Sequence, residues 1–190
     1  MSLANIVTAL RILLTPLLIV ILIKASGEDS FRYLAAAMLF FMGMSDGLDG
    51  YLAKTRNEVT RLGKYLDPVA DKVLVLSLCV LLASSLWPEP RLPVWLAVII
   101  VGREAFIFFG SLALYYQVAD WQPCPNVISK VNNVVQLVMF GMVIVNNVMP
   151  FPIVSAFLWA VAFLTLASWI SYLRLGIGFL TAGRGMTPTT

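Results

Sequence analysis

Long apolar stretches separated by short polar segments dominate the hydropathy pattern of this chain. Each stretch is about 20 residues long, the length that an α-helix needs to cross the hydrocarbon core of a bilayer. The breaks between them contain clusters of glycine, proline and charged residues, which favour turns. The pattern predicts six transmembrane helices, at Ile6–Ile23, Phe31–Ala53, Pro68–Leu86, Pro93–Tyr115, Ile128–Met149 and Pro152–Leu173.

The composition supports a membrane protein. Hydrophobic residues make up 60% of the 190 residues, more than a soluble domain of this size can bury. We therefore expect an all-α integral membrane protein that forms a six-transmembrane-helix bundle. One domain is expected over residues 1–180, followed by a flexible tail over residues 181–190 that is rich in glycine, proline and threonine.

Charge and residue usage exclude several classes of function. The chain has no histidine, which excludes histidine-ligated zinc and leaves acid–base chemistry to carboxylates or lysine. Cys79 and Cys124 form neither a disulfide pattern nor a metal pattern. The net charge of +3 is modest and does not indicate nucleic-acid binding.

The distribution of basic residues predicts the orientation in the membrane. The segment after the second predicted helix carries Lys54, Arg56, Arg61 and Lys64. The loops on the other side carry only Lys24, Arg32 and Arg91. Because cytoplasmic loops are enriched in lysine and arginine, we expect both termini and residues 54–64 to face the cytoplasm of a bacterial-type inner membrane.

Four of the ten acidic residues cluster around the same basic segment: Asp46, Asp49, Asp67 and Asp71. On a helix, the first two share one face with Gly50 and Ala53, at positions i, i+3, i+4 and i+7. The other two form an i, i+4 pair at the start of the next predicted helix, where Pro68 suits the first turn. A tight connection would bring the two pairs together.

Four carboxylates at one membrane edge repel one another unless something positive binds there. A pair of like charges about 4 Å apart costs about 4 kcal/mol at an effective dielectric constant of about 20. Oxygen ligands alone favour Mg²⁺ or Mn²⁺, and this set suits two ions about 3.5–4 Å apart. The alternative is that the aspartates are helix caps and loop charges, but their spacing among small residues on one face favours a metal site.

A resemblance to a known family rests on these residues. The stretch Asp46-x2-Asp49-Gly50-x2-Ala53-Lys54-x8-Gly63-x3-Asp67-x3-Asp71 resembles the signature of the CDP-alcohol phosphatidyltransferases. Seven of its eight positions match; Lys54 stands where the family usually has arginine, which keeps the charge but loses the bidentate fork. The chain length, the six predicted helices and the opening Asn5-x2-Thr8-x2-Arg11 also fit the family.

The resemblance implies a divalent-metal-dependent enzyme of phospholipid synthesis that forms a homodimer. It would transfer the phosphatidyl group of CDP-diacylglycerol to an acceptor hydroxyl and release CMP. Asp46, Asp49 and Asp67 would be metal ligands, and Asp71 would ligate the second metal and act as the general base. The residues implied for CDP-lipid binding are Gly50, Ala53, Lys54, Gly63, Asn5 and Thr8.

The acceptor is expected to contact further polar residues in the predicted helices: Arg11, Arg103, Lys130, Asn132 and Asn133. An intramembrane arginine is a functional hypothesis by default. The alternative for Arg103 is a buried structural pair with its neighbour Glu104. Lys130 has the alternative role of an interfacial lysine whose ammonium reaches the headgroups, and the two asparagines could simply satisfy backbone groups inside the bundle.

The identity of the acceptor is predicted from a second resemblance. Phosphatidylglycerophosphate synthases usually carry a second lysine and a threonine at the positions of Asn132 and Asn133, which suits the doubly charged phosphate of glycerol-3-phosphate. The pattern Ser129-Lys130-x-Asn132, followed by Gln136, is more similar to cardiolipin synthases of the CDP-alcohol type. We therefore expect phosphatidylglycerol as the acceptor, with glycerol-3-phosphate as the alternative.

Three other classes of protein remain as alternatives. Membrane prenyltransferases also place aspartates on helices, but they usually carry two separate aspartate-rich motifs. A cation channel or transporter would spread its acidic residues through the depth of the bilayer, whereas these four gather at one edge. A structural or interaction protein is the third alternative, if Lys54 disables the site.

Overall fold

The computed structural model describes the backbone over residues 3–56, 61–89, 91–117, 127–145 and 151–182, and the side chains over residues 10–45, 71–89, 91–112, 128–145 and 152–174. These segments contain six helices and no strand, which confirms the predicted all-α class. The helices are α1 (Leu3–Ala25), α2 (Asp29–Arg56), α3 (Arg61–Ala83), α4 (Val94–Gln117), α5 (Val127–Ile144) and α6 (Phe151–Ala182).

Several helix ends differ from the predicted ones. Helix α3 begins at Arg61, so Pro68 lies inside the helix and the prediction of a first-turn position was wrong. Helix α5 ends at Ile144, before the predicted Met149, and α6 continues to Ala182, past the predicted Leu173. Hydropathy marks where an apolar run ends, but helical hydrogen bonds continue into polar residues such as those of Arg61–Asp67.

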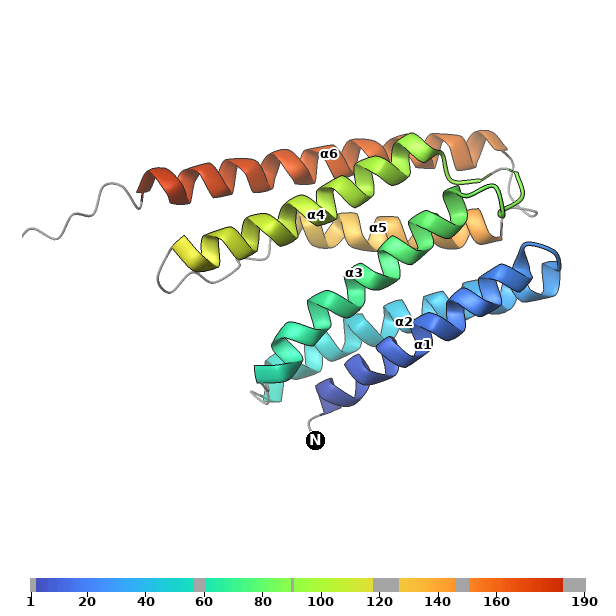
Figure 1. Ribbon diagram of the computed structural model, residues 1–190, viewed down its shortest axis with the longest axis horizontal. Helices are drawn as coiled ribbons and strands as arrows, with labels where there is room; N and C mark the ends of the chain where they lie inside the picture. The colour runs from blue at the N-terminus through green and yellow to red at the C-terminus, as the bar shows by residue number, and fades with distance from the viewer. Residues whose placement is uncertain (1–2, 57–60, 90, 118–126, 146–150, 183–190) are drawn as a thin grey trace, which may run out of the picture.

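The helices form two groups that share one end of the molecule (Figure 1). Helix α1 packs against α2 and α3, whereas α6 packs against α4 and α5. Contacts of α2 with α5 and of α3 with α4 join the two groups. The last turns of α1, α3 and α5 and the first turns of α2, α4 and α6 lie at the shared end, and the groups diverge toward the other end, where α2 is followed by α3 (Figure 1).

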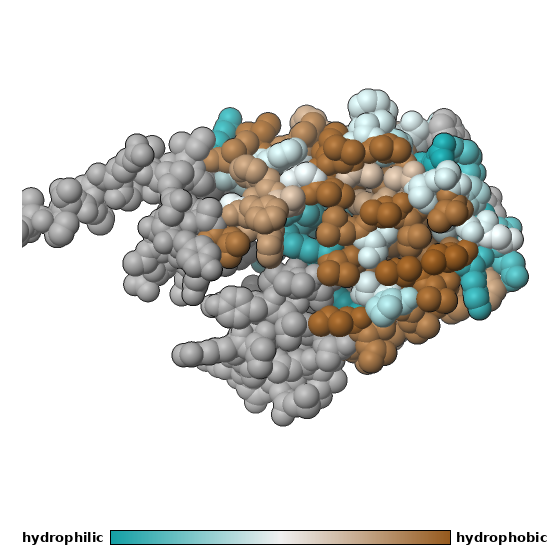
Figure 2. Space-filling model, viewed as in Figure 1, coloured by the Kyte–Doolittle hydropathy of each residue, from teal (hydrophilic) through white to brown (hydrophobic). Residues whose placement is uncertain are grey.

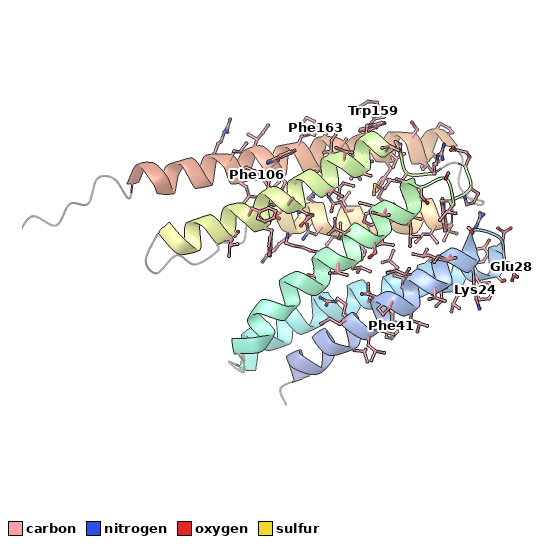
Figure 3. All side chains as sticks on the ribbon, viewed as in Figure 1. Lys24, Glu28, Phe41, Phe106, Trp159 and Phe163 are labelled. Carbon is pink, nitrogen blue, oxygen red and sulfur yellow. The ribbon has the colours of Figure 1, made fainter. Side chains whose placement is uncertain are left out.

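The surface of the bundle is largely apolar. Brown, hydrophobic side chains cover most of the described face in Figure 2, and hydrophilic ones gather at the end that carries the three connections. Phe41 of α2 and Phe163 of α6 are 75% and 74% exposed and point outward on opposite sides of the bundle (Figure 3). Lys24 and Glu28 lie at the connecting end (Figure 3). An apolar belt with a charged end suits a lipid environment.

Two helices meet the requirements of a membrane span on their own. Within the side chains that the structure describes, Val94–Leu112 of α4 and Pro152–Arg174 of α6 are long and apolar enough to cross a bilayer. The apolar part of α5, Ile128–Ile144, is shorter. The chain is therefore a helical protein with at least two helices of transmembrane character.

A close contact between α2 and α5 depends on the absence of a side chain at Gly43. A Cβ atom at this position would overlap with Cδ2 of Leu137. Gly43 lies three residues before Asp46 on α2, and Leu137 directly follows Gln136 on α5. The glycine therefore sets how closely the aspartate-bearing turn of α2 approaches α5.

We expect the Gly43→Ala substitution to destabilise the protein by about 1 kcal/mol, because the added methyl group displaces the Leu137 side chain from its position against α2. Gly110→Ala is the matched control, since a Cβ at Gly110 meets nothing within 4 Å. Alanine there is expected to be neutral or stabilising by up to about 1 kcal/mol, through helix propensity. Thermal unfolding of both purified variants in detergent measures the effect; equal melting temperatures would contradict the close contact.

Candidate functional site

The four predicted metal ligands lie on two consecutive helices, α2 and α3. Asp49 is seven residues before the end of α2 and Asp67 is six residues after the start of α3. At a rise of about 1.5 Å per residue, their Cα atoms are about 10 Å and about 9 Å along the helix axes from the connection. Asp46 and Asp71 are each ten residues, or about 15 Å, from it. The backbone therefore sets the aspartates at two matching levels.

Most of the predicted donor site has no described side chains. For three of the aspartates, Asp46, Asp49 and Asp67, the structure describes the helical backbone but not the side chain. The same holds for all residues predicted to bind the CDP-lipid: Gly50, Ala53, Lys54, Gly63, Asn5 and Thr8. Their roles stay predictions.

The carboxylate of Asp71 is bound by an arginine from another helix. Nη1 of Arg11 on α1 donates a hydrogen bond to Oδ1 of Asp71 on α3. The Arg11 side chain is only 5% exposed, whereas that of Asp71 is 48% exposed. Arg11 was predicted to bind the acceptor; the structure brings it against the predicted general base. A buried guanidinium needs such a partner, because an unpaired buried charge is costly.

Arg103 is the centre of a second polar cluster, which joins three helices. Its side chain is 1% exposed. Nη1 donates to Oδ1 of Asn133 on α5 at 3.0 Å and to Glu104, and Nη2 donates to Oγ of Ser168 on α6 at 3.1 Å and to Oγ of Ser129. The predicted pair with Glu104 is therefore present, and Arg103 also contacts Asn133, a second residue predicted to bind the acceptor.

Three buried donors in or beside this cluster lack a partner within the described part of the chain. They are Nε of Arg103, Nδ2 of Asn132 and Nε1 of Trp169, the residue after Ser168 on α6. The other end of the Asn132 amide, Oδ1, accepts a hydrogen bond from the Thr165 hydroxyl at 3.0 Å, and Gln136 donates to Thr165 at 3.2 Å. A buried donor without a partner costs about 1–3 kcal/mol. Oxygen atoms of a bound ligand would remove this cost.

Asn132 and Asn133 have different surroundings. Asn132 is fully buried between α5 and α6, whereas Asn133 is exposed apart from its contact with Arg103. Their predicted alternative role, satisfying neighbouring backbone groups, is not what the structure shows, since both amides bind side chains of other helices. Lys130 is exposed near the start of α5, a position that suits either of its predicted roles.

Sequence reasoning did not single out Lys72. Its ammonium donates to Oε2 of Glu104 at 2.8 Å and to the Glu104 carbonyl at 3.2 Å, so it links α3 to α4. The signal in the sequence was a lysine directly after Asp71, inside a predicted transmembrane helix. Asp71 and Lys72 are neighbours on α3, so the Arg11–Asp71 pair and the Arg103 cluster are joined into one polar region that extends from α1 to α6.

Comparison with known proteins identifies the family. The sequence model of the CDP-alcohol phosphatidyltransferase family matches residues 1–173. The chain is 30% identical over 185 residues to a CDP-diacylglycerol–glycerol-3-phosphate 3-phosphatidyltransferase of Bacillus subtilis, covering 90% of this chain and 93% of that protein. A protein of the same name from Aquifex aeolicus is 28% identical over 181 residues, which are 93% and 96% of the two chains.

The human protein named cardiolipin synthase (CMP-forming) is 30% identical over 194 residues, which cover 92% of this chain and 62% of the human protein. Relatives of both names are thus similar to this chain to the same degree. The match favours the phosphatidyltransferases over the prenyltransferase, channel and structural alternatives. The chain belongs to the CDP-alcohol phosphatidyltransferase family and is an enzyme that transfers a phosphatidyl group.

Proposed function

We propose that the enzyme transfers the phosphatidyl group of CDP-diacylglycerol to a hydroxyl of phosphatidylglycerol, which yields cardiolipin and CMP. The observation that carries this proposal is the polar region between the two groups of helices. There the half-exposed carboxylate of Asp71 lies on α3 next to Lys72, and Lys72 binds Glu104, the neighbour of Arg103. Glycerol-3-phosphate is the second candidate acceptor, since relatives named for its use are equally similar.

The donor substrate would bind at the end of the α2–α3 pair. Asp46 and Asp49 from α2, with Asp67 and Asp71 from α3, offer only carboxylate oxygens at two matching levels, which suits two Mg²⁺ or Mn²⁺ ions. When bound, the ions would neutralise the charge of the pyrophosphate and of the departing CMP. Lys54 adds a positive charge at this end of α2, and the small residues Gly50 and Ala53 let the nucleotide approach the backbone.

Asp71 would act as the general base. The acceptor hydroxyl oxygen attacks the β-phosphorus, the bond between this phosphorus and the bridging oxygen of CMP breaks, and the hydroxyl proton passes to the Asp71 carboxylate. General bases contribute about 10²–10⁴-fold to a rate. The hydrogen bond from buried Arg11 supports a fixed orientation of this carboxylate toward the acceptor.

The acceptor phosphate would bind at the Arg103 cluster. Nε of Arg103 and Nδ2 of Asn132 are buried donors that lack partners among the described residues, so phosphate oxygens would satisfy them. The doubly charged phosphate of glycerol-3-phosphate would be better balanced by a lysine at position 132, but the residue there is the neutral Asn132. The singly charged diester of phosphatidylglycerol needs less positive charge, and exposed Asn133 and Lys130 lie on the same helix to contact its headgroup.

All six helices would span the membrane, with the end of the α2–α3 pair facing the cytoplasm of a bacterial-type inner membrane. This orientation is supported by the positions of Lys24 in the last turn of α1, Arg32 in the first turn of α2 and Arg91 between α3 and α4, far along the helices from the connection between α2 and α3. The acyl chains of both lipid substrates would stay in the bilayer beside the diverging helices. We further propose that the enzyme works as a homodimer.

Replacing Asp71 with asparagine should lower the rate of CMP release by about 100-fold or more, because the amide cannot accept the hydroxyl proton. Asp29→Asn is the matched control: Asp29 is exposed at the opposite end of the bundle, where it pairs with Arg32 at 3.4 Å. The assay uses purified protein with CDP-diacylglycerol, phosphatidylglycerol and Mg²⁺ or Mn²⁺. Asp71→Asn protein that keeps activity near that of the control would refute the base assignment.

The acceptor is identified by comparing phosphatidylglycerol with glycerol-3-phosphate in the same assay. We expect kcat/KM to be at least about tenfold higher for phosphatidylglycerol, a difference that corresponds to about 1.4 kcal/mol in transition-state binding. Mass spectrometry of the lipid product provides an independent readout, as cardiolipin and phosphatidylglycerophosphate differ in mass. Turnover with glycerol-3-phosphate alone would replace the acceptor assignment and leave the family unchanged.

A further inference from the structure

Glu104 is a carboxylate that binds two cations on different helices. Its Oε1 accepts a hydrogen bond from Arg103, its neighbour on α4, and its Oε2 accepts one from Lys72 of α3 at 2.8 Å. The side chains of Glu104 and Lys72 are 12% and 20% exposed, and that of Arg103 is almost fully buried. Charges buried to this degree require partners of opposite sign, so each of the three groups depends on the others.

The geometry of the Arg103–Glu104 pair is unusual for a helix. Adjacent residues on a helix project in different directions, and side chains at i and i+1 do not normally face each other. Here the Arg103 side chain also reaches Ser129 and Asn133 on α5 and Ser168 on α6. Glu104 and Asn133 therefore restrain Nη1 of the guanidinium, while Ser129 and Ser168 restrain Nη2.

The second oxygen of Glu104 connects this arginine to the predicted base. Lys72 directly follows Asp71 on α3, and Asp71 is bound by Arg11 of α1. The ammonium of Lys72 also donates to the Glu104 carbonyl at 3.2 Å, and it lies 5.8 Å from the ring centroid of Phe108. The turn of α3 that carries Asp71 is thus bound to the turn of α4 that carries Arg103.

We infer that Glu104 is a positioning residue for the acceptor: it fixes the orientation of the Arg103 guanidinium and, through Lys72, the distance between Arg103 and Asp71. This inference rests on the proposed function, in which Arg103 binds the acceptor phosphate and Asp71 takes the hydroxyl proton. It assigns no contact between Glu104 and the substrates. Its effect is expected on the acceptor, because Asp71, the donor-site residue on this turn of α3, is also bound by Arg11 of α1, independently of Glu104.

The test is the Glu104→Gln variant, in which an amide of the same shape cannot balance two cations. CMP release is measured with the acceptor varied at saturating CDP-diacylglycerol, and then with the donor varied at saturating acceptor. We expect the KM for the acceptor to rise about tenfold, as for the loss of a hydrogen bond between charged groups. The KM for CDP-diacylglycerol should stay within about twofold, which a general loss of structure would not allow.

Two further variants complete the experiment. Glu104→Asp keeps the charge and should restore the acceptor KM to within about threefold of the wild-type value. Glu89→Gln is the matched control, because Glu89 forms an exposed pair with Arg91 at 2.8 Å in the α3–α4 connection. If Glu104→Gln does not fold, Lys72→Gln removes the other side of the bridge and should raise the acceptor KM in the same direction.

The outcomes separate this inference from the proposed function. A wild-type enzyme that uses neither phosphatidylglycerol nor glycerol-3-phosphate would overturn the proposed function, and the inference with it. Active wild-type protein whose acceptor KM is unchanged in Glu104→Gln or Lys72→Gln would overturn the inference alone. The same conclusion would follow if both KM values rose together and the melting temperature fell.

Discussion

Charged side chains can persist inside an apolar helix bundle only when each one has a partner, because moving an unpaired ion out of water is expensive. This constraint organises the interior of the protein. Arg11 is paired with Asp71, and Glu104 binds both Arg103 and Lys72. These pairs run from α1 to α3 and from α3 to α4, and hydrogen bonds extend them to α5 and α6. The polar groups therefore hold together helices whose outer faces are apolar.

The same contacts bring a carboxylate, a lysine and an arginine together across α3 and α4, with Asp71 and Lys72 on α3 and Arg103 on α4. At the shared end, the interior is filled by side chains such as Leu22, Leu82 and Leu96. Toward the other end the helices diverge (Figure 1). The buried side chains farther along α4, α5 and α6 include Arg103, Asn132 and Ser168. An enzyme that transfers a phosphatidyl group needs this division, because acyl chains require an apolar exterior and a phosphate-bearing headgroup requires polar partners.

Particular residues show how far sequence alone leads. The aspartate spacing from Asp46 to Asp71 pointed to the family that the comparison then identified. Hydropathy located all six helices but misplaced the start of α3, because helical hydrogen bonding continues past an apolar run into Arg61–Asp67. Arg11 was assigned to the acceptor because a sequence gives the presence of an intramembrane charge and not its partner. Lys72 was not singled out, since its partner Glu104 is 32 residues away.

The sequence by itself determined the helical class, the family and the identity of the chemical groups, because periodicity, hydropathy and a fixed spacing of aspartates are local properties of a chain. Only the tertiary structure decided which groups meet: that Arg11 binds Asp71, that Asn132 is buried while Asn133 contacts Arg103, and that Gly43 lets α2 approach Leu137. These contacts depend on how helices far apart in the sequence pack, and the pairing of a buried charge is settled by that packing.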